Sequence, residues 1–73
     1  MGAKYLEPGS RQKIGVVRLV EPNGNERFKI FQGNKSYFGT VAGMAVSDKK
    51  WSTEAEAQNY LDLLAKARNW KKV

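Results

Sequence analysis

The stretch RFKIFQGNKSYFGT, residues 27–40, contains two apolar runs separated by Gly33 and Asn34. A two-residue Gly-Asn loop between such runs is typical of a β-hairpin, and it sets the register so that Phe31 faces Ser36. Directly paired residues share one face of a sheet, and side chains alternate along each strand. We therefore expect one buried face and one opposite face, the first holding Phe28, Ile30, Tyr37 and Val41 and the second holding Arg27, Lys29, Phe31, Ser36, Phe38 and Thr40.

The second face combines basic residues with aromatic residues. Sheet surfaces that bind nucleic acid have this composition, because cations hold phosphates while aromatic rings stack on bases. A structural alternative carries equal weight at this point: small domains often cover part of a second sheet face with another segment, and Phe31 and Phe38 would then be buried by it.

The rest of the chain divides into an arm and a single domain. Residues 1–12, MGAKYLEPGSRQ, show no periodicity and predict a flexible, disordered N-terminal arm, and residues 13–73 predict one small domain. The β-branched run at 13–21 predicts a first strand, and Gly43 predicts a break before a short fourth strand at 44–47. In the first strand we expect Val17 and Leu19 to face the core, with Ile14, Val16 and Val20 on the alternate side.

The sequence STEAEAQNYLDLLAKARNW, residues 52–70, predicts an amphipathic helix. Thr53 is the expected N-cap with Glu56 as its capping-box partner, and Trp51 is expected to hold the helix onto the sheet. The apolar stripe follows helical spacing through Ala57, Tyr60, Leu61 and Leu64. Trp70 either closes the end of the core or is exposed as a contact.

The predicted fold class is α+β: an antiparallel β-meander of three to four strands with one C-terminal α-helix packed on one face.

Composition limits the function. The chain has 73 residues with 13 Lys and Arg against 7 Asp and Glu, a formal charge of +6 that attracts polyanions. It has no Cys and no His, and its carboxylates lack catalytic companions, so we expect no catalytic residue, no metal, no cofactor, no small-molecule substrate and no enzyme activity. The apolar runs are too short for a membrane span, and the absence of a signal peptide favours a cytoplasmic location.

Residues 27–67 resemble a known arrangement. A sheet of about three strands followed by one helix entered through KKWSTEAEAQNYLDLLA resembles the DNA-binding domains of plant ethylene-response factors and of the arm-binding ends of phage and transposon integrases. Small bacterial YegP-like proteins share the pattern. The resemblance to the DNA-binding domains implies that the sheet enters the DNA major groove with basic residues from its exposed face, and Arg27 and Lys29 match that role. This face is richer in Phe than the integrase type, which favours backbone-led or single-stranded binding.

Two functions follow. The first is a small nucleic-acid-binding module, an accessory protein of a phage or mobile element, with DNA favoured over RNA. Its expected binding residues are Arg18, Arg27, Lys29, Phe31, Lys35, Phe38, Lys49 and Lys50. The alternative is a protein–protein interaction module, a homodimer among the options, that uses Phe31, Phe38 and Trp70 as an apolar patch.

Overall fold

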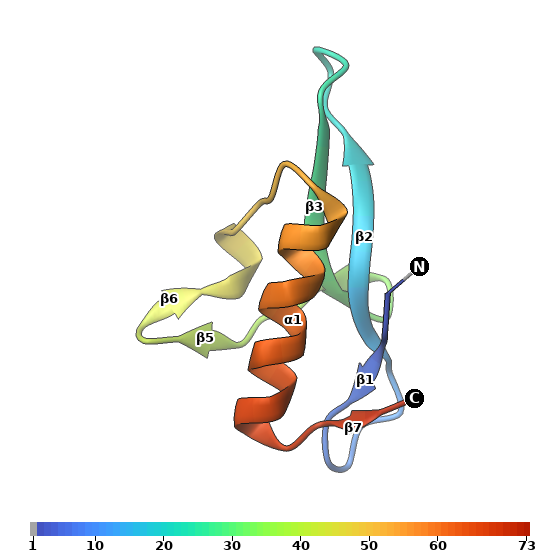
Figure 1. Ribbon diagram of the computed structural model, residues 1–73, viewed down its shortest axis with the longest axis vertical. Coiled ribbons are helices and arrows are strands. Elements are labelled where there is room, and N and C mark those ends of the chain that lie inside the picture. The colour runs from blue at the N-terminus through green and yellow to red at the C-terminus, as the bar shows by residue number, and fades with distance from the viewer. Residues whose placement is uncertain (1) are drawn as a thin grey trace.

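Two seven-residue strands, β2 (Ile14–Val20) and β3 (Glu26–Gln32), form the centre of the sheet in the computed structural model, which describes residues 2–73. Short strands extend the sheet on both sides in the antiparallel order β4-β3-β2-β1-β7, where β4 is Lys35–Ser36, β1 is Tyr5–Leu6 and β7 is Lys71–Lys72. The α-helix, α1 (Glu54–Arg68), lies across one face of the sheet (Figure 1). This arrangement confirms the α+β class, and the sheet has five strands because both ends of the chain join it.

The β3–β4 hairpin has the predicted register. Phe31 pairs with Ser36, and Gly33 adopts a φ of 63° at the first loop position, as a type II′ turn requires. The paired strand ends at Ser36 and does not continue to residue 41 as we expected. Past Ser36 the Tyr37 amide still donates to the Ile30 carbonyl at 3.0 Å. A Cβ atom on Gly39 would collide with the Tyr37 ring, so this part of the link requires glycine.

A separate two-stranded hairpin follows, formed by β5 (Thr40–Val41) and β6 (Met44–Ala45). Its loop residues Ala42 and Gly43 both have positive φ, 51° and 80°, which is the geometry of a type I′ turn. The fourth strand predicted at 44–47 ends at Ala45, because the chain then enters a 3₁₀ helix, η1 (Val46–Asp48).

The core lies between α1 and the inner face of the sheet. Its fully buried large side chains are Ile14, Ile30, Val46 and Leu61. Tyr37 and Trp70 close one end of the core, with their rings in edge contact at a centroid distance of 5.2 Å and an interplanar angle of 79°. Of the residues expected to be buried together, Ile30, Tyr37, Leu61 and Leu64 are buried, whereas Phe28 and Tyr60 are half-buried.

The predicted faces of β2 are wrong. Ile14 is fully buried, and Val16 pairs with the buried Ile30, so these residues face the core. Val17 and Leu19 lie on the opposite face, where Leu19 is 38% exposed. Both faces of β2 carry β-branched or other apolar residues, so its register against β3 decides which face is buried.

The N-terminal segment also differs from expectation. We predicted a disordered arm over residues 1–12, but Tyr5–Leu6 form β1 between β2 and β7, and the Tyr5 side chain is buried. Met1 lies outside the described residues. Tyr5 supplies an aromatic ring to the core and a hydroxyl that bonds to Asp62 of α1, and these contacts hold the segment in place.

The helix begins as predicted. The Glu56 backbone amide donates to Thr53 Oγ1 at 3.2 Å, and the Thr53 hydroxyl donates to the Glu56 carboxylate at 2.9 Å. Trp51 joins the start of the helix to the sheet. Its backbone exchanges two hydrogen bonds with Phe28, and its ring centroid lies 5.0 Å from that of Tyr60. The helix ends at Arg68 and is capped by Asn69, which adopts the left-handed conformation with a φ of 57°.

Candidate functional site

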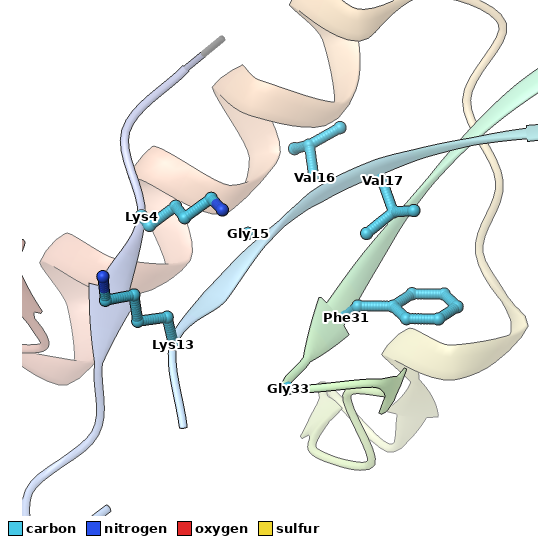
Figure 2. A pocket seen from close by; sticks show the side chains of 7 residues that line it. All are labelled: Lys4, Lys13, Gly15, Val16, Val17, Phe31 and Gly33. Carbon is cyan, nitrogen blue, oxygen red and sulfur yellow. The ribbon is translucent and has the colours of Figure 1, made fainter. Parts of the chain in front are cut away.

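The face of the sheet opposite α1 carries the candidate site. We define the outer sheet face by the six residues of β2 and β3 that point away from the core: Gly15, Val17, Leu19, Arg27, Lys29 and Phe31. Cross-strand pairing places Gly15 beside Phe31 and Val17 beside Lys29. Figure 2 shows part of this face, with α1 behind the sheet. The β2 half of the face is apolar, and the β3 half supplies two cations and an aromatic ring.

The cations of this face differ in their partners. Arg27 Nε lies 3.5 Å from Glu21 Oε1, and Glu21 is shared with Lys50, whose Nζ is 3.4 Å from its second oxygen. Lys29 makes no ion pair within residues 2–73. Its ammonium group is therefore available to an external anion, whereas Arg27 is partly neutralised.

A shallow hollow of about 60 Å³ opens on the outer sheet face (Figure 2). Gly15 forms its floor, with the side chains of Lys4, Lys13, Val17 and Phe31 around it. A Cβ atom on Gly15 would lie 3.1 Å from Lys4 Cγ, so the aliphatic part of Lys4 lies close beside the glycine. No carboxylate lines this hollow in the part of the chain that the structure describes, and its chemistry is cationic and aromatic.

The structure brings together only three of the eight predicted binding residues, namely Arg27, Lys29 and Phe31. Arg18 pairs with Phe28, so it lies on the opposite face of the sheet from these three, and it forms a 3.1 Å ion pair with Glu26.

The other four residues lie elsewhere. Lys35 pairs with Gln32 and so points to the opposite side from Phe31. Lys49 lies 5.6 Å from the Tyr60 ring centroid on the helix side, and Lys50 is paired with Glu21. Phe38 lies in the link after β4 and is 76% exposed.

Sequence reasoning missed Lys4 and Lys13. Lys4 fell within the predicted arm, and nothing local shows that β1 brings it beside β2. Gly15 was the available signal, because a glycine inside a strand often marks a close approach of other atoms.

A second hollow lies on the helix side. Its volume is about 200 Å³, and its lining is almost wholly apolar: Val41, Tyr60, Leu63, Leu64 and Ala67. We call it the helix groove. Leu63 is 69% exposed, and the buried Tyr60 hydroxyl has no hydrogen-bond partner within residues 2–73. An exposed, almost wholly apolar hollow of this kind is typical of a contact surface.

The pKa values of two tyrosines, Tyr5 and Tyr37, are raised, and both side chains lie in the core. The hydrogen bond to the Asp62 carboxylate, with burial as a smaller cause, raises the pKa of Tyr5. Burial raises the pKa of Tyr37, whose hydroxyl also accepts a 3.2 Å hydrogen bond from Arg68. Neither residue belongs to the outer sheet face.

Acidic side chains do not gather into any metal-binding group of three or more in the described residues. Within the same residues, α1 is too short and too polar to cross a membrane.

Comparison with known proteins gave no match to any protein-family model, to any curated protein or to any solved structure.

Proposed function

We propose that the protein is a small nucleic-acid-binding module that binds DNA or RNA through the outer sheet face, DNA being favoured, as an accessory protein of a phage or mobile element. The observation that carries the proposal is the position of Lys29 beside Phe31 on a sheet face that the helix leaves uncovered. Lys4 and Lys13 stand at the edge of the same face. Together these residues offer three ammonium groups that make no ion pair within residues 2–73.

The chemistry suits a nucleic acid. Ammonium groups bind phosphates irrespective of sequence, and an aromatic ring stacks on bases or sugars. The resemblance of residues 27–67 to integrase and ethylene-response-factor domains implies the same use of the sheet. The guanidinium of this face, that of Arg27, lies 3.5 Å from Glu21, which competes with bidentate reading of guanine, so we expect contacts to the nucleic-acid backbone to dominate.

The test compares two charge reversals. Lys29→Glu places a carboxylate on the outer sheet face, whereas Lys35→Glu makes the same change in charge on a residue that points to the opposite side. The affinity of each variant for a fluorescein-labelled 20-mer, single-stranded and duplex, is measured by anisotropy from 50 to 300 mM NaCl. We expect Lys29→Glu to weaken binding clearly more than Lys35→Glu and to lower the slope of log K against log salt by about one.

Two outcomes would overturn the proposal. Equal losses in the two variants would show that binding follows net charge without using this face. A wild-type protein that binds neither probe at 50 mM NaCl would remove the nucleic-acid function altogether.

A second candidate function is protein–protein interaction at the helix groove. The apolar patch predicted from the sequence consists of Phe31, Phe38 and Trp70. Trp70 is buried in the core, so it cannot contribute to a surface patch. The helix groove offers apolar surface in its place, and Leu63 in its lining is 69% exposed. Sedimentation equilibrium tests the simplest occupant, a second copy of the chain. A dimer that Leu63→Glu converts to a monomer, while Lys29→Glu does not, would support this function, and a wild-type monomer at all concentrations would count against self-association.

A further inference from the structure

We propose that the hollow beside Gly15 receives the phosphate of one nucleotide of a single strand, held by Lys4 and Lys13, while the base or sugar of that nucleotide lies against Phe31. This inference rests on the proposed function and narrows it, because it names the strand state and the subsite. It also assigns a role to Lys4 and Lys13, which lie outside β3.

Gly15 creates the subsite. Gly15 is buried beneath the Lys4 side chain, and a Cβ atom on it would lie 3.1 Å from Lys4 Cγ. The missing side chain therefore lets Lys4 lie against β2 next to Phe31, the cross-strand partner of Gly15, and the hollow opens beside them. Glycine weakens a strand relative to a residue with a side chain, and it is often found in strands where other atoms approach closely. The other outer-face residues of β2, Val17 and Leu19, carry branched side chains, so such a close approach is confined to Gly15.

The lining selects an anion of small size. Two lysines from separate segments border the hollow, and no described carboxylate does. A volume of about 60 Å³ is far below the several hundred Å³ of an ordinary small-molecule site, but it can receive a compact group such as a phosphate. The hollow therefore suits one unit of a polymer that binds mainly along the rest of the face.

Phe31 selects a single strand. Its ring is half-buried at the edge of the hollow, beside the Lys29 and Val17 side chains of the same face. A base can lie against such a ring only when its own face is free, which is true of a single strand and not of a base stacked within a duplex. Duplex DNA would reach the lysines but leave the ring unused.

The test fills the hollow without changing any charge. Gly15→Val suits the site, because the backbone of Gly15 lies outside the left-handed region and the nearest atoms belong to the flexible Lys4 side chain. The control is Ser36→Val, which adds an isopropyl group on the other side of Phe31, at its partner in β4. The probes are a labelled dT15 strand and a 15-base-pair duplex at 100 mM NaCl. We expect Gly15→Val to weaken dT15 binding by about fivefold or more, the loss of one stacked base, with duplex binding changed by less than about twofold.

The outcomes separate this inference from the proposed function. If Gly15→Val binds dT15 as tightly as the wild type, or if Ser36→Val weakens dT15 binding equally, the subsite is wrong although the outer sheet face still binds. Equal losses for dT15 and duplex would overturn the single-strand assignment. A wild type that binds neither probe would fail the proposed function itself.

A second pair of variants keeps the test decisive if Gly15→Val does not fold, which a thermal melt would show. The variant Lys4→Gln/Lys13→Gln removes both ammonium groups of the hollow, and Lys35→Gln/Lys66→Gln removes two exposed ones elsewhere. For dT15 binding by Lys4→Gln/Lys13→Gln, the slope of log K against log salt should fall by about 1.4, because two phosphate contacts on a single strand are lost. The slope for Lys35→Gln/Lys66→Gln should fall by less. Equal slopes for the two variants would overturn the subsite.

Discussion

The Tyr5 hydroxyl donates a 2.6 Å hydrogen bond to Asp62 Oδ1, and this bond ties the first strand of the chain to the middle of α1. Gln58 reinforces the connection by donating both to the same carboxylate oxygen at 2.9 Å and to the backbone carbonyl of Ala3 at 3.0 Å. Lys4 lies between the two anchored residues, so these bonds place its side chain beside Gly15. The core contact of Tyr5 thereby helps to form the hollow on the other face of the sheet.

Tyr5→Phe should lower the free energy of unfolding by about 1.5 kcal/mol or more, because it removes a hydrogen bond to a charged partner. Urea denaturation followed by circular dichroism measures the loss. The matched control is Tyr60→Phe, since the Tyr60 hydroxyl has no partner among residues 2–73 and its removal should leave stability unchanged or raise it. Similar losses in the two variants would contradict a specific role for the Tyr5–Asp62 bond.

Stability should also fall above pH 10, and Tyr5 should contribute to the fall. The Asp62 hydrogen bond raises the folded-state pKa of Tyr5 above the usual value of about 10. Above that pH the unfolded chain loses the tyrosine proton first, so the contribution is complete below pH 10 and decreases as pH rises toward the folded-state pKa. Urea midpoints at pH 8 and pH 10.5 should differ less for Tyr5→Phe than for the wild type. Some decrease should persist in the variant, because burial raises the pKa of Tyr37 as well.

Thr53→Ala should cost about 1 kcal/mol of stability without changing nucleic-acid binding, because the Glu56 amide loses its capping acceptor. Ser52→Ala is the control, since Ser52 is exposed and lies just outside the cap. A midpoint for Thr53→Ala equal to that of Ser52→Ala would show that the cap contributes nothing in solution.

Trp70→Ala should destabilise the fold by about 3 kcal/mol or more, because it removes a buried ring that packs on Tyr37. Phe38→Ala should change stability by less than about 0.5 kcal/mol, since its ring is 76% exposed. Thermal melts of both variants provide the comparison. A large loss for Phe38→Ala would mean that this ring is covered in solution.

Local signals in the sequence determined several elements of this protein. The turn at Gly33, the Thr53 cap and the apolar stripe of α1 all appear where they were predicted, because each depends on residues within a few positions of one another. Lys29 and Phe31 were likewise assigned to a common face by the hairpin register alone, and the structure keeps them there. In these segments, backbone geometry and side-chain spacing leave little choice.

Contacts between distant segments decided the buried face of β2, the position of the N-terminal strand and the hollow beside Gly15. Ile14 faces the core and Val17 does not because β2 is aligned by its pairing with β3, and an apolar strand gives no local sign of which face will be buried. Tyr5 is ordered because its ring and hydroxyl meet the core and Asp62, 57 positions away. The hollow beside Gly15 exists only because β1 carries Lys4 to that position. Pairing and packing energies between remote segments, which no short stretch encodes, determined the candidate site.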